Sequence, residues 1–279
     1  MADNSELRER LIEKAKSGIK EAYSNEEYAL MQAVNAWLEL GKSRNLASER
    51  LAEWFGIYAP ESVKAGEADL AKRVMELAEK GGEGGSSMGR RMNGDEASAL
   101  KSFAEYGVKA DAALESLEAY LKVAANRLMP NATYLTDEKI ASELLSRAGS
   151  LERLATMPAS TVQLLGAEKA LFKHIKYGSK PPKYGVLFKL ADVTSAPKDQ
   201  KGRIARVYAT KLSIALKADY FSKRFIADQL KKDLQESLKR IAEAPPRQRP
   251  QQRQERQGRF QPRKRFGRPD GRQRGQRRN

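Results

Sequence analysis

The 279-residue chain contains no cysteine, one histidine and two tryptophans. The lack of cysteine excludes a disulfide framework, a thiolate zinc site and a cysteine nucleophile. No run of about 18 uninterrupted apolar residues occurs, so the sequence predicts no helix that spans a membrane. The charged segment 1–13 lacks the apolar stretch of a signal peptide. The absence of cysteine suits an intracellular protein.

The sequence also lacks an arrangement of residues that is typical of a catalytic site. The only histidine, His174, lies among lysines, and no pair of carboxylates has the spacing of an acid–base pair. No glycine motif follows a predicted strand, and no cluster of metal ligands is present. We therefore expect no catalytic residue, no metal and no cofactor, and the chain is predicted not to be an enzyme.

The net charge of +16 is distributed unevenly along the chain. Residues 1–149 carry 20 bases and 25 acids, residues 150–244 carry 19 bases and nine acids, and residues 245–279 carry 13 bases and two acids. This polarity predicts that a polyanion is bound by the basic half. The last segment consists mainly of Arg, Gln, Gly and Pro, so we expect a disordered tail that binds nucleic acid without sequence specificity.

Helical periodicity extends over most of the chain, and no convincing β-sheet pattern is present. We predict helices over residues 7–23, 26–58, 65–80, 95–128, 202–217 and 221–244. A further helix is expected between Thr136, which would cap it, and Gly149, which would close it. The glycines and serines of 81–87 predict a flexible loop near 81–95. The predicted fold class is all-α.

The clearest periodic signal lies in residues 95–128, where apolar residues alternate at three- and four-residue steps. This pattern is typical of coiled-coil packing. A helix of about 33 residues is roughly 50 Å long, and the helix expected over 26–58 has a similar length, so we predict an antiparallel hairpin. The pattern does not distinguish a monomeric bundle from a rod that dimerises. The expected seam residues are Leu100, Phe103, Leu114, Leu117, Leu121 and Leu128.

A basic segment between Lys169 and Lys217 holds 12 bases and two acids. Its lysines recur at helical spacing after Gly166, where a helix N-terminus could receive a phosphate. Beside the Pro181–Pro182 turn, a tyrosine could stack on an unpaired base while lysines contact phosphates. The alternative is an ordinary solvated surface. The candidate RNA-binding residues are Gly166, Lys169, Lys173, His174, Lys176, Lys180, Lys183, Tyr184, Lys201, Arg203, Arg206 and Lys211.

Three motifs in this segment read Gly166-Ala-Glu-Lys-Ala-Leu-Phe-Lys-His, Pro181-Pro-Lys-Tyr-Gly and Gly202-Arg-Ile-Ala-Arg. In their order and spacing they resemble the Nop domain. Upstream, Met31-Gln-Ala-Val-Asn-Ala-Trp and Glu49-Arg-Leu-Ala-Glu-Trp-Phe-Gly resemble the start of that family's coiled coil. The resemblance covers residues 26–243. It favours the archaeal subunit of box C/D ribonucleoproteins over the nucleolar and spliceosomal members.

The sequence predicts four parts: an N-terminal helical extension (1–25), a coiled-coil hairpin (26–131), a Nop domain (132–244) and the basic tail (245–279). The resemblance supports the middle two, and the other two follow from residue pattern and composition. In the family, the Nop domain binds a kink-turn of a box C/D guide RNA together with a small kink-turn-binding protein. The coiled coil joins two copies of the subunit. The implied function is a cytoplasmic RNA-binding scaffold, a homodimer that supports RNA 2′-O-methylation in rRNA processing by a separate fibrillarin-like methyltransferase.

Departures from the family pattern leave other hypotheses open. Only about 25 residues precede the hairpin, so we expect the family's fibrillarin-holding domain to be absent, which puts direct docking of the methyltransferase in doubt. Tyr184 stands where the family usually has histidine, and Lys201-Gly-Arg203 inverts the usual Arg-Gly-Lys. A general RNA-binding or chaperone-like Nop-domain protein is the first alternative. A purely structural dimer, with little affinity for RNA beyond that of its tail, is the second.

Overall fold

A computed structural model describes residues 2–63, 70–79 and 88–244, and every regular element in these ranges is helical. The all-α prediction is therefore confirmed for the described residues. The glycine-rich stretch 81–87 and the tail 245–279, for which flexibility and disorder were predicted, lie outside them. None of the helices in the described ranges combines the length and the apolar composition that a bilayer crossing requires.

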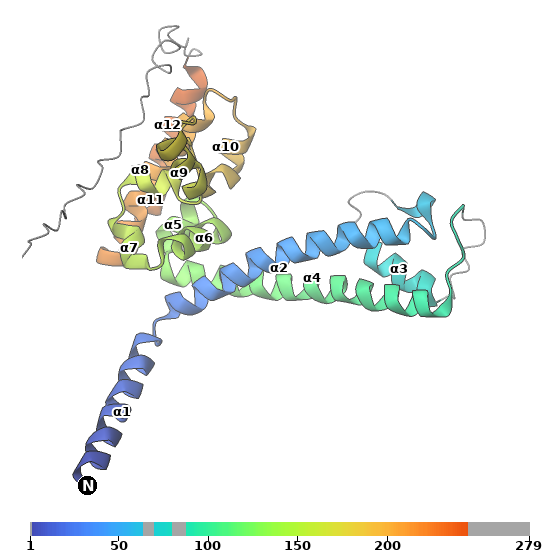
Figure 1. Cartoon of the computed structure of the whole chain (residues 1–279). Coiled ribbons are helices and arrows are strands. Elements are labelled where there is room, and N and C mark those ends of the chain that lie inside the picture. Colours follow the sequence, from blue (N-terminus) through green and yellow to red (C-terminus); the bar gives the residue numbers. More distant parts are fainter. Residues whose placement is uncertain (1, 64–69, 80–87, 245–279) are drawn as a thin grey trace, which may run out of the picture.

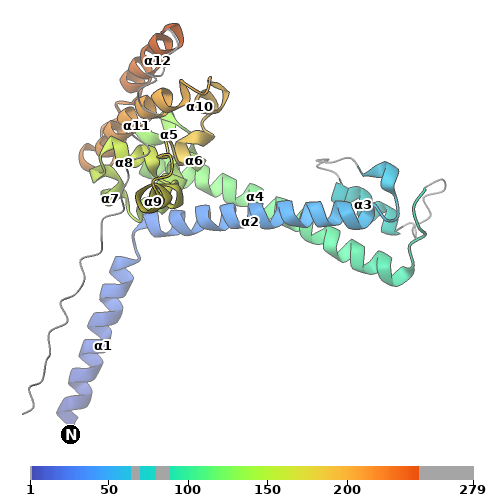
Figure 2. The same ribbon diagram turned by 45° about the horizontal axis from the view of Figure 1, so that its top comes forward.

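Two long antiparallel helices form a rod. α2 (Glu26–Phe55) and α4 (Gly94–Leu128) run side by side in both views (Figures 1 and 2). A short 3-10 turn, η1 (Pro60–Ser62), follows α2, and α3 (Leu70–Glu79) packs against α4 at the far end of the rod. α1 (Ala2–Ala22) precedes α2 and projects away from the other helices (Figure 1). The two long helices are thus antiparallel neighbours, and their packing as a coiled coil stays a prediction.

The predicted seam is buried mainly toward the ends of the rod. Leu100 and Leu121 have no exposed surface. The other four seam residues are only half-buried, namely Phe103, Leu114, Leu117 and Leu128. The core is accordingly divided into two clusters, one around Leu100 at the far end and a larger one that includes Leu121 at the near end.

Polar contacts hold the middle of the rod, because α2 offers small and charged side chains there. A Cβ atom added at Gly41 would meet nothing within 4 Å, so the helices leave room at this level. A little further on, Arg44 Nε donates to Asp111 Oδ1 at 2.6 Å across the two helices. An ion pair between half-exposed side chains stabilises much less than buried apolar packing does.

The chain after the rod folds into a cluster of shorter helices around α11 (Lys201–Lys217). One face of α11 is buried through residues such as Ala205, Leu212 and Leu216. Its neighbours include the helices before and after it. The surrounding elements are α5 (Pro130–Leu135), α6 (Glu138–Ala148), α7 (Leu151–Thr156), α8 (Ala159–Leu164), α9 (Glu168–Tyr177), η2 (Val186–Lys189), α10 (Ala191–Ser195), η3 (Ala218–Ser222) and α12 (Ala227–Glu243).

Several predicted helix boundaries were wrong. α1 begins at Ala2 and not at Leu7, and α2 ends at Phe55 and not at Tyr58. Asp137, and not Thr136, caps α6, because Asp137 Oδ1 accepts from the amide of Ile140 at 2.6 Å. Gly149 closes that helix in the left-handed conformation, as predicted. The helix expected over 221–244 begins only at Ala227, since α11 continues into the π-helical turn η3 and the chain reverses at Lys223.

A buried carboxylate joins the exit of the rod to the turn after α11. Asp219 is 2% exposed and accepts hydrogen bonds from the amide of Asn131 (3.0 Å), from Asn131 Nδ2 (2.7 Å) and from the amide of Ala132 (3.0 Å). Burial raises the pKa of Asp219, while the donors on Asn131 and Ala132 oppose that rise. The carboxylate therefore satisfies the first turn of α5 from a segment distant in sequence.

Replacing this carboxylate should destabilise the fold. Asp219→Ala leaves buried amide donors without an acceptor, and we expect the free energy of unfolding to fall by about 3 kcal/mol. Urea titration followed by circular dichroism measures the change. Asp199→Ala removes an exposed carboxylate and is expected to shift stability by less than about 0.5 kcal/mol. Equal stabilities of the two variants would show that the junction does not depend on Asp219.

Candidate nucleic-acid interface

The lysines predicted to contact RNA lie on α9, a helix of which no residue is buried. Lys169, Lys173 and Lys176 follow one another at three- to four-residue spacing, which places them on one side of the helix. All three are exposed, and no carboxylate among the described residues forms an ion pair with them. α9 therefore presents a row of free cations to solvent.

Apolar side chains stand beside these lysines, and the sequence analysis did not single them out. Phe172 is 70% exposed and Ile175 is 64% exposed. Their spacing of three residues puts them on a common stripe of α9, next to Lys169 and Lys176. The available signal was the apolar pair within a helix otherwise rich in lysine. α9 thus displays two chemistries side by side, one cationic and one apolar.

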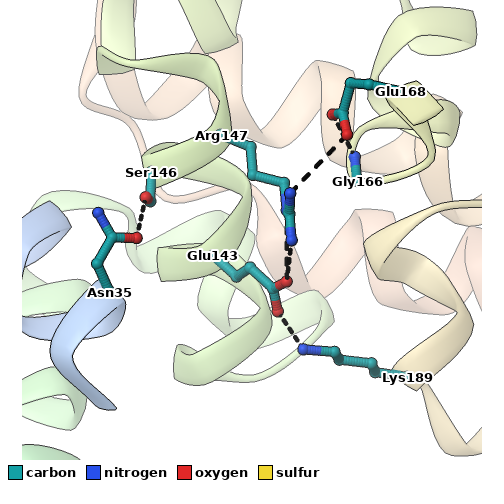
Figure 3. A network of polar contacts seen from close by, with 7 residues as sticks. All are labelled: Asn35, Glu143, Ser146, Arg147, Gly166, Glu168 and Lys189. Carbon is teal, nitrogen blue, oxygen red and sulfur yellow. Dashed lines mark hydrogen bonds and ion pairs between the residues drawn. The ribbon is translucent and has the colours of Figure 1, made fainter. Parts of the chain in front are cut away.

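A polar network fixes the start of α9 (Figure 3). The carboxylate of Glu143 on α6 is 5% exposed and accepts from Arg147 at 3.2 Å and from Lys189 on η2. Arg147 also pairs with Glu168 at 3.8 Å, and Glu168 Oε1 accepts from the amide of Gly166 at 2.6 Å. One buried acid therefore links α6, η2 and the first turn of α9.

The same helix α6 connects this network to the rod. Ser146 Oγ donates to Asn35 Oδ1 on α2 at 2.6 Å, as Figure 3 shows. Ser146 and Arg147 are adjacent in sequence, so the contacts to α2 and to α9 leave α6 from neighbouring positions. The orientation of α9 is consequently tied to that of the rod.

The structure corrects the role expected for Gly166. It does not open the helix, which begins at Glu168, and its amide is not free because it donates to the Glu168 carboxylate. That carboxylate lies in the first turn, where the helix dipole favours negative charge, and it occupies the place proposed for a phosphate. Gly166 has a φ of +89°, a value that favours glycine, so its contribution is to shape the chain before α9.

Two short segments lie close together beneath residues 179–184, which connect α9 to η2 and are called the basic loop below. The amide of Val186 donates to the carbonyl of Leu165 at 2.7 Å, and the amide of Gly185 donates to the carbonyl of Gln163 at 3.0 Å. A Cβ atom at Gly185 would lie 1.8 Å from the Leu165 oxygen, so only glycine fits there. Gln163 Nε2 also donates to the carbonyl of Lys183 at 2.5 Å. The loop is therefore fixed relative to the chain that leads into α9.

The basic loop meets the start of α11 and forms a second cationic cluster. A Cβ atom at Gly202 would lie 3.4 Å from Lys183 Cδ, so the stem of Lys183 passes directly over this glycine. Lys183 is thereby brought to the two sequence neighbours of Gly202, Lys201 and Arg203. The Lys201 ammonium donates to the carbonyl of Thr194 at 2.6 Å. In the described part of the chain, Lys183 and Arg203 are the cations of this cluster that form no ion pair.

Tyr184 was predicted to stack on a base, and the structure gives its ring a protein partner. The Tyr184 and Phe188 rings stack at 4.9 Å with an interplanar angle of 12°, and Tyr184 is half-buried against the core. Lys201 lies over the Phe188 ring at 5.2 Å. One face of Tyr184 is thus taken, and a base could reach only the other.

The remaining predicted residues differ in availability. Lys180 and Arg206 are exposed. His174 Nδ1 lies 2.5 Å from the carbonyl oxygen of Ser179, an acceptor, so this nitrogen carries the hydrogen and holds the turn after α9. Lys211 pairs with Asp233 on α12 at 2.8 Å and lowers the pKa of that carboxyl. Lys211 therefore joins α11 to α12 and is not a free cation.

The arrangement can bind a polyanion by electrostatics, and its chemistry is that of contact and positioning. In the described part of the chain, no three histidine, aspartate or glutamate side chains come together as metal ligands. The cations come from α9, from the loop at Lys183 and from the start of α11, three elements that the contacts above hold in fixed relation.

Comparisons with known proteins place these features in a family. Residues 24–240 match the sequence profile described as "Nop: snoRNA binding domain, fibrillarin". An uncharacterized NOP5 family protein of Methanocaldococcus jannaschii is 34% identical over 257 residues, with 82% of this chain and 60% of the relative covered. Nucleolar protein 58 of Candida albicans is 35% identical over 214 residues, with 69% and 42% covered. Nucleolar protein 56 of Homo sapiens is 32% identical over 238 residues, with 75% and 40% covered.

A solved structure shares the fold. It is described as a fibrillarin/Nop5p complex and matches with a TM-score of 0.52 at 23% identity, covering 84% of this chain and 77% of the other. The chain spans 60% of the length of the Methanocaldococcus relative and 42% of that of the Candida protein. Because the family profile matches residues 24–240 and two relatives are 34% and 35% identical, this chain belongs to the Nop family.

Proposed function

We propose that the chain is a non-catalytic, RNA-binding scaffold subunit of a box C/D guide ribonucleoprotein. It recognises a kink-turn RNA together with the kink-turn-binding protein already on that RNA. The observation that carries this proposal is α9, whose exposed lysines stand beside exposed Phe172 and Ile175.

The two chemistries of α9 fit a joint surface of RNA and protein. Lysines that lack a carboxylate partner gain most from phosphates, because each contact releases condensed counterions. Phe172 and Ile175 gain nothing from phosphates, and exposed apolar side chains in a group mark a surface that another protein covers. An RNA with a protein bound beside it satisfies both halves of the helix at once.

The second cationic cluster extends the footprint beyond α9. Lys183 lies over Gly202, next to Arg203, and Arg206 follows one helical turn later. The Glu143 network and the hydrogen bonds beneath the loop hold these groups before any RNA arrives. Such preorganisation reduces the entropy that binding would otherwise cost.

The family membership supports the same proposal. The matched profile is described as a snoRNA-binding domain, and two relatives are named nucleolar proteins. We propose that methyl transfer to the RNA 2′-hydroxyl is performed by a separate fibrillarin-like methyltransferase, and that this chain supplies neither a catalytic group nor a cofactor. The role of the chain is then to hold RNA and protein in the right relation.

A gel-shift titration on a box C/D kink-turn RNA tests this function. The full chain and its 1–244 version are titrated with and without the kink-turn-binding protein, at moderate salt. We expect at least about tenfold tighter binding to the preformed RNA–protein complex, because only that complex offers both surfaces. Binding that is indifferent to the kink-turn-binding protein would favour the general RNA-binding alternative. Loss of affinity in the 1–244 version would leave a structural dimer with a basic tail.

The lysines of α9 are tested by substitution. Lys169→Ala, Lys173→Ala and Lys176→Ala together should weaken RNA binding about tenfold or more and lower the salt slope by about 3. The matched control replaces Lys14, Lys16 and Lys20 with alanine, three exposed lysines on α1. The assignment of α9 fails if both triple variants bind RNA equally well.

We also propose that the rod joins two copies of the chain. Tyr120 and Val123 on α4 are 41% and 66% exposed, and they lie one helical turn apart beside Leu121, which is buried in the near-end cluster. Pairing of two rods would cover them. The apolar contribution of one such side chain is about 1.5–3 kcal/mol when it is fully buried.

The dimer is tested by sedimentation equilibrium. The wild-type chain should have twice its monomer mass of 31.2 kDa, and Val123→Glu should shift the mass to that of the monomer. Lys122→Glu changes a neighbouring exposed residue that carries no apolar surface to the pairing, and it should leave the dimer intact. A wild-type chain that stays at 31.2 kDa at all concentrations would contradict the proposal.

A further inference from the structure

A group of exposed aromatic and cationic side chains lies at the opposite end of α11 from the cluster at Lys201 and Arg203. Phe221 is 64% exposed, Phe225 is 55% exposed and Tyr134 is 42% exposed. We call the group the junction patch. It consists of Tyr134, Phe221, Lys223, Arg224, Phe225 and Lys231.

The rings of the junction patch are held in defined orientations. Tyr134 and Phe225 meet edge to face with their centroids 5.6 Å apart, although they come from α5 and from the turn before α12. Lys231 lies over the Tyr134 ring at 4.4 Å. Phe221 meets Tyr220 edge to face at 4.9 Å. These contacts fix the rings through their edges and leave much of the Phe221 and Phe225 surfaces in solvent.

The backbone that carries the patch is strained and firmly held. Lys223 has a φ of +54° and is the one residue other than glycine with positive φ in the described part of the chain. Its amide donates to the carbonyl of Ala218 at 2.7 Å. Asn131 accepts from the amide of Ile226 at 2.6 Å and donates to the carbonyl of Arg224 at 2.8 Å. A costly conformation kept by so many contacts points to a use for the side chains that it presents.

The charge of the patch selects its ligand. Residues 217–232 contain five cations and two acids. One acid is the buried Asp219, and the other, Asp228, bonds to the Tyr134 hydroxyl and raises its pKa. Accessible rings among free cations are the combination that binds unpaired nucleotides, with bases on the rings and phosphates on the cations.

We propose that the junction patch binds an unpaired RNA segment that leaves the structured element held at α9. This inference rests on the proposed function, because it extends the same RNA to a second surface. α11 has 17 residues and is therefore roughly 25 Å long, so its two ends are separate binding surfaces joined by one rigid element. An acidic peptide would match the cations but would leave Phe221 and Phe225 without partners of their own.

The test compares two RNAs on the full chain. One is a kink-turn stem, and the other is the same stem with an unpaired uridine strand of about ten nucleotides attached. The wild-type chain should bind the extended RNA about tenfold more tightly, as expected when bases stack on aromatic rings. Phe221→Ala with Phe225→Ala should abolish this gain and leave the affinity for the stem unchanged. Both side chains are more than half exposed, so the fold should tolerate their loss.

Two controls separate the possible failures. The α9 triple lysine variant should lose affinity for both RNAs and keep the ratio between them. Tyr28→Ala removes another exposed aromatic ring and should change neither affinity. A gain that survives in the double phenylalanine variant overturns the proposal, as does a wild-type chain that binds the stem without any gain from the extension. A wild-type chain that binds neither RNA overturns the proposed function itself.

An acidic peptide provides the last arm of the experiment. One outcome is that poly-glutamate binds the wild-type chain but not the double phenylalanine variant, while the RNA extension gives no gain. That result would assign the junction patch to a protein ligand and refute the RNA assignment. We expect instead that poly-glutamate binding, where it occurs, is the same in both chains, because its contacts are to the cations alone.

Discussion

The buried carboxylate of Asp219 joins the end of the rod to the helical cluster. It accepts from two backbone amides and one side-chain amide at the point where α4 gives way to α5. The partner of those amides, Asn131, also holds the turn before α12. The end of the rod, the end of α11 and the start of α12 therefore converge on two side chains. These two side chains help to set how the rod, α11 and α12 are placed relative to one another.

α9 is held in place differently, because none of its residues is buried. Its start is fixed by Glu168, which is tied through Arg147 to the buried Glu143, and its end is fixed by His174 on the Ser179 carbonyl. Polar contacts at both ends replace the apolar packing that anchors most helices. The apolar side chains of Phe172 and Ile175 and the lysine row of α9 thus remain available to a ligand.

Local patterns in the sequence were sufficient for the two long helices and for the lysine row, because both depend on spacing along one element. The all-α class, the two long helices and the exposure of Lys169, Lys173 and Lys176 belong to this group. Contacts between distant segments could not be read in this way. The pairing of Lys211 with Asp233 and the capture of the Gly166 amide by Glu168 both required the fold. The seam was only partly informative, since periodicity does not reveal how closely a partner helix approaches.

The division of the rod into two apolar clusters has a mechanical consequence. Each end is rigid because Leu100 and Leu121 sit in separate close-packed regions, whereas the level of Gly41 and Arg44 between them has open space and a half-exposed ion pair. Bending stress should concentrate at this level, because fewer close-packed side chains resist deformation there than at either end. The rod therefore behaves as two stiff levers with a compliant joint. Such a joint would let the far end of the rod change its angle relative to the helical cluster at the near end.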